Sequence, residues 1–299
     1  MHQPSPIVLF TYLRLETLQK TINALAANFY ASDSDLIIFS DGAKYLKDEA
    51  KVKEIRTYLK TIIGFKSLVI HESNTNKGLA ISIIQGVSYV LKEYPSAIVL
   101  EDDLITSTNF LAFMNDSLTR FKEVKKVYSI SGYSFDFPNQ SIKEDGYFLN
   151  RSWSWGWATW ADRWQEIDWQ MRDYSEFSSN MREVSEFSNL GSDANKMLSN
   201  QMYGNADSWY IRSTYHQFKI KGLAFYPTIS KVNNEGFDAL ATHNKGLKTR
   251  FITNFDTSNK VSFKFPEKIQ INIALQSEFL NKMSLTNRIY NRILEFFFT

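Results

Sequence analysis

The stretch Ala97-Ile-Val-Leu-Glu101-Asp102-Asp103 joins four apolar residues directly to three acidic ones. Four consecutive apolar side chains are typical of a strand that is buried on both faces in the middle of a parallel sheet. Ligands of open α/β sheets bind outside the carboxyl ends of such strands, which is where the acidic triplet falls. Three carboxylates at that place are costly unless a positive group binds them. We therefore interpret Glu101, Asp102 and Asp103 as a candidate site for a divalent cation.

The triplet also indicates which cation and which ligand to expect. Carboxylate oxygens suit Mg²⁺ and Mn²⁺, which usually keep one or two protein carboxylates and take other ligands from water and substrate phosphates. A nucleoside diphosphate supplies such phosphates. The alternative is an acidic turn that caps the next helix, since Thr106 and Ser107 follow and the run after Asn109 has a helical pattern. The triplet by itself favours neither interpretation.

Strand-like apolar runs alternate with helical patterns along the first 125 residues. The expected strands begin at Ile7, Leu36, Ser67 and Ala97, and the expected helices cover 15–27, 47–63, 79–91 and 110–121. This alternation predicts an α/β fold with a mainly parallel sheet flanked by helices. Polar residues end each of these strands, so one edge of the sheet is expected to hold a nucleotide pocket. Beyond residue 127 we expect two further strands, a tryptophan-rich segment and an exposed helical region up to about residue 200.

Composition excludes several classes of protein. The 299 residues are 43% apolar, contain no cysteine and carry a formal net charge of +2. A charge this small gives no basic field for DNA or RNA, so no nucleic-acid partner is expected. The absence of cysteine excludes disulfides and thiolate metal sites and fits a reducing compartment. The first residues lack the pattern of a signal peptide, and no run reaches the roughly 20 apolar residues that span a bilayer. We expect a cytoplasmic location, with the inner face of the cell membrane as an option.

Two further strand ends carry candidate donor-binding residues. Asp41-Gly42 follows an apolar run, and its carboxylate could accept hydrogen bonds from a base or a ribose, although Asp-Gly is also an ordinary turn. The segment from Asn74 through Lys77 leads into a helix and offers backbone donors, a cation and a helix N-terminus, all of which suit phosphate. A simple capped helix start fits the same residues equally well.

The segment 151–164 contains five tryptophans. Trp153, Trp155 and Trp157 alternate as on an extended strand, whereas Trp157, Trp160 and Trp164 have helical spacing. We expect the helical set to be buried and the extended set to face a pocket in part, where indoles stack on a sugar ring. Core packing is the alternative. Glycine between two of them, Gly156, would let the backbone pass close to a ligand.

Two isolated residues complete the candidate site. Asp207 precedes an expected helix that contains Trp209, and a helix cap is the ordinary role of such a residue. His243 could be a neutral imidazole ligand of the metal or a donor to phosphate, although a single histidine is more often structural.

Taken in order, these pieces resemble the GT-A glycosyltransferases, which transfer sugars from nucleotide donors. The closer likeness is to the branch with N-acetylglucosaminyltransferase I, with family-2-like bacterial polysaccharide transferases as neighbours. The matching pieces are Ile7-Val-Leu-Phe-Thr-Tyr-Leu-Arg14, Phe39-Ser-Asp41-Gly, Val99-Leu-Glu101-Asp-Asp103-Leu, Ser154-Trp-Gly156-Trp, Asp207-Ser-Trp209 and Ala241-Thr-His243. The likeness covers residues 6 to 245. It implies a GT-A domain over 1–245, with a nucleotide-binding half at 1–125 and an acceptor-binding half at 126–245.

The resemblance also implies roles for individual residues. Arg14 and Asp41 match the residues that hold the base and phosphates of the donor, and Glu101 and Asp102 match those that touch the donor sugar and ribose. Asp103 matches the direct ligand of Mn²⁺ or Mg²⁺. We add Lys77, Trp155 and Gly156 to the donor site and His243 to the metal site.

Asp207 matches the catalytic base of the related enzymes. Those enzymes have two adjacent acids at this place, whereas Ala206 and Ser208 leave a single carboxylate here. The resemblance implies a metal-dependent, inverting hexosyltransferase that moves a sugar, expected to come from a UDP-sugar, to a hydroxyl of a glycan or lipid-linked glycan in bacterial surface polysaccharide synthesis. The alternatives are a sugar-1-phosphate nucleotidyltransferase and a non-catalytic carbohydrate-binding protein.

The residues after 245 match nothing in the resemblance and form a basic extension over 246–299. Beyond His243, nine Lys and Arg against four Asp and Glu give +5, which leaves −3 for the rest of the chain. Leu285, Ile289 and Ile293 recur at helical spacing, with arginines beside them. Such a helix can lie on an anionic membrane surface or pack back on the domain.

Overall fold

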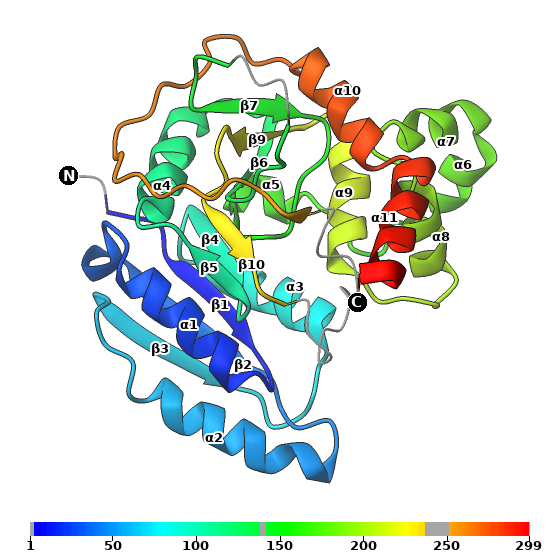
Figure 1. The fold of residues 1–299 in the computed structure, drawn as a ribbon. Helices are drawn as coiled ribbons and strands as arrows, with labels where there is room; N and C mark the ends of the chain where they lie inside the picture. Colours follow the sequence, from blue (N-terminus) through cyan, green and yellow to red (C-terminus); the bar gives the residue numbers. More distant parts are fainter. Residues whose placement is uncertain (1–2, 138–141, 237–250, 299) are drawn as a thin grey trace.

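An eight-stranded sheet forms the centre of the computed structural model, which describes residues 3–137, 142–236 and 251–298 (Figure 1). The strands are β1 (Ile7–Thr11), β2 (Asp35–Ser40), β3 (Ser67–Glu72), β4 (Ser96–Glu101), β6 (Val127–Ser131), β7 (Gly146–Leu149), β8 (Trp157–Trp160) and β9 (Leu223–Pro227). Their order across the sheet is β3-β2-β1-β4-β8-β6-β9-β7. The neighbours from β3 to β4 are parallel, as are β6 and β9, whereas β8 and β7 run antiparallel to their neighbours.

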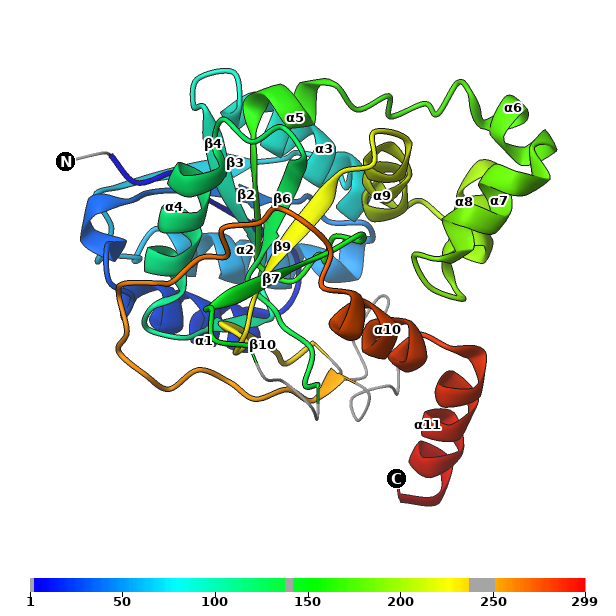
Figure 2. The same ribbon diagram turned by 90° about the horizontal axis from the view of Figure 1, so that it is seen from above.

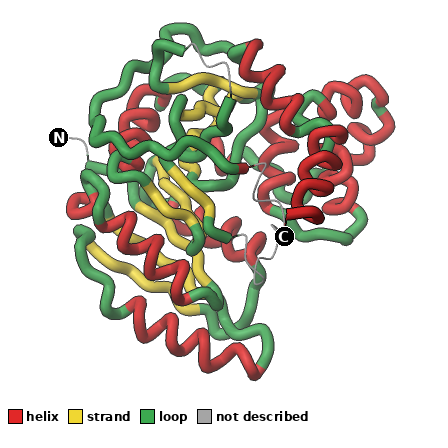
Figure 3. The backbone as a smooth tube through the Cα atoms, viewed as in Figure 1, coloured by secondary structure: helices red, strands yellow, loops and turns green. Residues whose placement is uncertain are grey.

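Helices cover both faces of this sheet, as Figure 3 shows in red and yellow. One face packs against α1 (Leu15–Ala26), α2 (Glu49–Leu59) and α4 (Phe110–Phe121), and the other against α3 (Leu79–Val90), α5 (Ala161–Gln165) and α9 (Trp209–Lys219). Side chains of a strand point alternately to the two faces, so Ile7 and Leu9 join the first core and Val8 and Phe10 the second. The predicted class, an α/β fold with a mixed, mainly parallel sheet and a C-terminal helical extension, is confirmed.

The strand order reverses between β1 and β4. The chain leaves β1 for β2 and β3 on one side and returns to β4 on the other side. Helix crossovers of this kind place the carboxyl ends of β1 and β4 beside each other at one edge. Two short 3₁₀ helices, η1 (Ala31–Asp33) and η2 (Leu46–Asp48), lie in the connections around β2.

A short strand that the sequence did not predict follows the acidic triplet. This strand, β5 (Leu104–Thr106), pairs antiparallel with β10 (Val232–Asn234) to form a separate two-stranded sheet. Helix α4 starts only afterwards, at Phe110. The pairing matters for function because it brings the segment after β10 onto the acidic triplet.

The tryptophan-rich segment is mostly interior. The predicted burial of Trp157, Trp160 and Trp164 is confirmed, with exposed fractions of 5%, 3% and 2%. Only Trp164 lies on a helix, the short α5, whereas the other two lie on strand β8. Trp157 stacks on Trp164 and on Trp209 of α9, with ring centroids 5.5 and 4.8 Å apart. The indoles therefore bind α9 and α5 to the sheet.

Three short helices project from one side of the sheet: α6 (Tyr174–Ser179), α7 (Met181–Ser188) and α8 (Ala194–Met202) (Figure 2). They have a small core of their own, which includes Phe177, Phe187 and Leu198. Buried Arg151, two residues after β7, donates to Asp193 at 2.8 Å and to the carbonyl oxygen of Leu190 at 3.0 Å. This buried ion pair ties the helical insertion to the sheet.

The residues from 251 onward first pack on the domain and then leave it. Phe251 and Phe279 belong to the main core, the latter on α10 (Ile273–Lys282). Helix α11 (Leu285–Phe298) extends away from the sheet (Figure 2). Among the described residues, no helix combines the length and the apolar character that crossing a bilayer requires.

Candidate active site

An arginine and two aspartates meet at the point where the strand order reverses. Arg14, which precedes α1, follows β1, and Asp102 and Asp103 follow β4. Arg14 Nη2 lies 2.7 Å from Asp103 Oδ2 and 3.3 Å from Asp102 Oδ1. All three side chains are largely buried, with exposed fractions of 18% for Arg14, 7% for Asp102 and 10% for Asp103. The structure thus brings these three predicted site residues together.

Asp102 is fixed by the end of β1. Its Oδ2 accepts hydrogen bonds from Thr11 Oγ1 at 2.8 Å and from the Tyr12 amide at 3.1 Å. With Arg14 on Oδ1, both oxygens of this carboxylate have partners. Asp103 differs, because within the described chain only its Oδ2 accepts a side-chain hydrogen bond. Asp102 is therefore held in place, and Asp103 keeps one oxygen for a ligand.

One arginine does not balance the three acids. The pKa of Glu101 is raised to about 8, first by burial and then by the charges of Asp103 and Asp102, with Arg14 acting in the opposite direction. The pKa of Asp102 is raised to about 6, mainly by burial, with Arg14 and the hydrogen bond from Thr11 acting in the opposite direction. A second positive charge would lower both pKa values and favour the ionised carboxylates. The electrostatics of this site favour a bound cation.

The segment after β10 closes one side of the acidic cluster. The Glu235 amide donates to the carbonyl oxygen of Asp103 at 2.9 Å, and Glu235 pairs with Lys20 of α1 at 3.3 Å. A Cβ placed on Gly236 would lie 2.0 Å from Asp103 Oδ2, so only glycine fits beside the carboxylate. The sequence offered no signal for Gly236, because its position depends on the pairing of β10 with β5. His243 comes seven residues later and lies outside the described residues.

The donor atoms fit a hard divalent cation that takes only part of its coordination from the protein. Asp103 Oδ1 and the carboxylate of Glu101 are the available oxygens, because Arg14 occupies Asp103 Oδ2. In the described parts of the chain no group of three or more His, Asp or Glu side chains has metal-binding geometry. Mg²⁺ and Mn²⁺ commonly accept one or two carboxylates and complete their shell with water and phosphate oxygens.

Asp41 and Lys77 form a second group beside the first. Asp41 Oδ1 accepts from the Lys77 amide at 2.9 Å, and Oδ2 accepts from the Gly78 amide at 3.0 Å, at the start of α3. Asp41 is thus the anion at this helix N-terminus, which the sequence suggested for a phosphate. Thr11 links the two groups, because its carbonyl oxygen accepts from the Asp41 amide at 3.1 Å. Their donor-binding roles stay predictions.

A cavity of about 330 Å³ opens next to Asp41 and Lys77. The rings of Phe39 and His71 stack in its wall with centroids 4.7 Å apart, and Tyr89 of α3 meets His71 edge-on. This cavity lies at the same carboxyl edge as the acidic cluster.

Asp207 lies apart from both groups. It precedes Ser208, whose hydroxyl caps α9, and it pairs with Arg212 one turn into the helix. Its side chain is 53% exposed. Helix α9 packs on α3, but no contact recorded in the described chain joins Asp207 to the acidic cluster. Its predicted role as a base stays a prediction.

Trp155 and Gly156 occupy positions that differ from the expected open platform. Trp155 is only 7% exposed and packs edge-on against Tyr133 and Phe251, so its predicted exposure to a pocket is wrong. Gly156 has φ +59°, and a Cβ there would lie 2.7 Å from Val232 of β10. The glycine allows close contact with β10, and the donor-binding roles of both residues stay predictions.

No family model matches this chain, and no curated protein matches it in sequence. Solved structures do match. One is the mannosyltransferase PcManGT from Pyrobaculum calidifontis in complex with GDP-Man and Mn²⁺, with 12% identity, a TM-score of 0.31, and coverage of 44% of this chain and 36% of that one. Another is S. aureus TarS, with 10% identity, a TM-score of 0.41, and coverage of 76% and 37%. The matches thus span little more than a third of either protein's length.

Proposed function

We propose that this chain is a glycosyltransferase that takes a sugar from a nucleoside diphosphate donor and transfers it to a hydroxyl group of a glycan. The observation that carries the proposal is the cluster of Arg14, Asp102 and Asp103 at the reversal point between β1 and β4. Ligands of open α/β sheets bind at such a point. A cluster that joins an arginine to carboxylates suits a diphosphate bound together with a divalent cation.

The chemistry requires stabilisation of the leaving group. Negative charge develops on the diphosphate as the bond to the anomeric carbon breaks. Mn²⁺ or Mg²⁺, when bound, would act as a Lewis acid on the phosphate oxygens. Asp103 would hold the cation, Glu101 lies within reach as a further ligand, and Arg14 would donate hydrogen bonds to the departing phosphate. Lys77 and Asp41 would contact the nucleoside side of the donor.

The acceptor hydroxyl must lose a proton as it attacks the anomeric carbon. Asp207 is our candidate for the base, because its side chain is half exposed and carries an accessible carboxylate. Attack from the face opposite to the leaving group inverts the configuration at that carbon. Arg212, which pairs with this carboxylate, would orient it toward the acceptor.

The acceptor that we propose is a glycan or lipid-linked glycan of a bacterial surface polysaccharide, and the donor is a UDP-sugar. A place at the inner face of the cell membrane belongs to the same proposal. It is supported by α11, on which Leu285, Ile289, Tyr290 and Ile293 are each at least half exposed. An apolar face of this kind beside arginines suits an anionic lipid surface.

A thermal-shift panel of UDP, GDP, CDP and ADP, with and without Mn²⁺, tests the donor site. We expect one nucleotide to stabilise the protein only in the presence of Mn²⁺, and Asp103→Ala to abolish that effect. Asp33→Ala removes an exposed aspartate of η1 and is the matched control. Stabilisation by none of the nucleotides, or an unchanged shift in Asp103→Ala, would contradict the proposal.

A further inference from the structure

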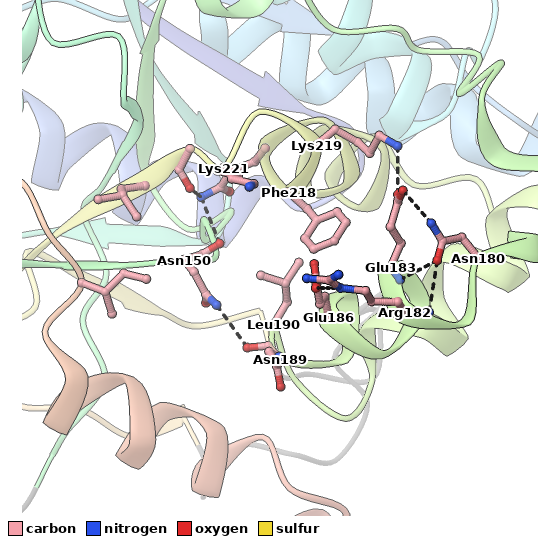
Figure 4. A pocket seen from close by; sticks show the side chains of 14 residues that line it. Asn150, Asn180, Arg182, Glu183, Glu186, Asn189, Leu190, Phe218, Lys219 and Lys221 are labelled. Carbon is pink, nitrogen blue, oxygen red and sulfur yellow. Dashed lines mark hydrogen bonds and ion pairs between the residues drawn. The ribbon is translucent and has the colours of Figure 1, made fainter. Parts of the chain in front are cut away.

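A second cavity lies far from the acidic cluster. Its volume is about 660 Å³, and it opens between α7, the end of α9 and the beginning of β9 (Figure 4). Asp207 precedes α9, whereas Lys219 and Lys221 mark its other end, so the 11-residue helix separates them by roughly 16 Å. Strand β9 is parallel to β6 and, through β8, to β4, so its first residue lies at the opposite edge of the sheet from the acids.

Most charges that line this cavity already have partners. Arg182 pairs with Glu186 at 2.9 Å along α7, and Lys219 pairs with Glu183 at 3.0 Å across the cavity (Figure 4). Lys221 differs, because no carboxylate of the described residues lies within ion-pair distance of its ammonium group. The cavity therefore has one net positive charge to offer a ligand.

The backbone conformation at Lys221 is unfavourable for lysine, which indicates that the side chain has a role of its own. Its φ of +53° lies in the left-handed region, directly after the cap of α9. Glycine or asparagine usually fills this position because other residues are strained there. A lysine at this place adds strain and supplies an exposed cation at the rim of the cavity.

Neutral amides supply the remaining free polar groups. Asn150 Oδ1 is buried without a hydrogen-bond partner, while its Nδ2 donates to the carbonyl oxygen of Asn189 at 3.2 Å. The side-chain amide of Asn189 is exposed and, within the described chain, makes no recorded hydrogen bond. A buried acceptor without a partner calls for a donor from outside the protein. Phe218 and Leu190 add apolar surface between these groups (Figure 4).

We propose that this cavity is a second binding site and that its ligand is an acidic saccharide. Sugar hydroxyls would bond to Asn150 and Asn189, and the carboxylate or phosphate of the same saccharide would pair with Lys221. The site goes beyond the proposed transfer reaction, since it would hold an acidic glycan at a distance from the donor. It requires no nucleotide and no metal.

Calorimetric titration with trigalacturonate, glucose 6-phosphate and maltotriose tests the site on the full chain. We expect the acidic probes to bind and neutral maltotriose to bind at least about tenfold more weakly, because one charge-assisted contact is absent. Whichever acidic probe binds more tightly identifies carboxylate or phosphate as the preferred group. Lys221→Gly should weaken the acidic probe by about tenfold without loss of thermal stability, because glycine removes the backbone strain.

Three further variants make the result specific. Asn150→Ala should weaken all probes that bind, since it removes the buried acceptor. Lys60→Gly, at the end of α2, removes an exposed lysine elsewhere and should leave binding unchanged. Asp103→Ala should also leave it unchanged, which separates this site from the donor site. The proposal is overturned if no acidic probe binds at millimolar concentration, if maltotriose binds equally well, or if Lys221→Gly retains full affinity.

Discussion

Arg14 and Asp103 are 89 residues apart in the chain, yet Arg14 Nη2 lies 2.7 Å from Asp103 Oδ2. The contact crosses the point where the strand order reverses, because Arg14 follows β1 and Asp103 follows β4. The arginine occupies Oδ2 of this carboxylate and leaves Oδ1 for a divalent cation. The two positive groups therefore compete for the negative charge of Asp103 until a diphosphate gives the arginine another partner.

Removing the arginine should have opposite effects on metal and nucleotide. In Arg14→Gln we expect Mn²⁺ alone to bind about tenfold more tightly, because three carboxylates lose their positive neighbour. The nucleotide identified by the thermal-shift panel should bind more weakly in saturating Mn²⁺. Calorimetry measures both affinities. Lys20→Gln, which removes a half-exposed cation from Glu16 and Glu235, is the control, and equal Mn²⁺ affinity in Arg14→Gln and wild type would refute the competition.

Gly236 provides a steric test of the same carboxylate. The added methyl group of Gly236→Ala would lie 2.0 Å from Asp103 Oδ2, so Asp103 must move. We expect transfer activity to fall on the order of a hundredfold, as for other displacements of about 1 Å in active sites. Gly64→Ala is the control, because its φ of +98° imposes strain far from the acids. Full activity of Gly236→Ala would show that Asp103 has no fixed role.

Asp207→Asn should separate binding from chemistry. The variant keeps the shape of the side chain but cannot accept the acceptor proton, so kcat should fall by about 10²- to 10⁴-fold. Metal-dependent nucleotide binding should not change, because no recorded contact joins Asp207 to the acidic cluster. Steady-state kinetics and the thermal shift measure the two effects. Asp173→Asn, the control, removes another aspartate, which pairs with Lys219, and should be active. Near-full turnover of Asp207→Asn would eliminate Asp207 as the base.

His216 should make stability depend on pH. Burial lowers the pKa of this imidazole below 6.5, although Glu166, Asp168 and Asp173 oppose the shift. The unfolded chain therefore binds a proton more readily than the folded one, so the free energy of unfolding should fall as pH falls below about 6.5. Above that pH the histidine is neutral in both states and contributes no slope. Urea unfolding at about pH 8 and about pH 5.5 measures the difference. His216→Gln and His216→Phe should both flatten the profile, and an unchanged slope in both would assign it to other groups.

Helix α11 should decide membrane association. We expect the full chain to co-sediment with vesicles that contain anionic lipid, and removal of residues 285–299 to abolish this. Ile289→Asp combined with Ile293→Asp should have the same effect, since these side chains are 51% and 50% exposed. Ile63→Asp is the control, because it changes an isoleucine that is 85% exposed and lies outside α11. Co-sedimentation that survives truncation would place the membrane contact elsewhere in the chain, and failure of the full chain to co-sediment would exclude it.

Local pattern was sufficient for the first half of the fold. The apolar runs at Ile7, Leu36, Ser67 and Ala97 became β1 to β4, and the helix predicted over 110–121 matches α4. These elements could be read because strands buried on both faces are apolar throughout, and helices that cover them repeat their apolar residues every three or four positions. The same logic placed the acids at the carboxyl end of a central strand.

Pattern failed where neighbours in space decide the conformation. Helical spacing suggested one stripe for Trp157, Trp160 and Trp164, but pairing of β8 with β4 and β6 holds the first two in a strand. Trp155 was expected to face a pocket, yet Tyr133 and Phe251, distant in sequence, cover it. Tertiary packing overrides local preference in such segments because the buried area gained exceeds the small difference in intrinsic propensity.

The sequence by itself determined the α/β class, the order of the first four strands along the chain and the presence of acids at a strand end. Only the tertiary structure decided that Arg14 pairs with two of these acids, that Gly236 closes over Asp103 and that the carboxylate of Asp41 occupies the N-terminus of α3. The physical reason is the sequence separation over which each kind of interaction acts. Periodicity reports which face of an element is buried, whereas an ion pair or a steric contact depends on a side chain from another part of the chain, which no local pattern specifies.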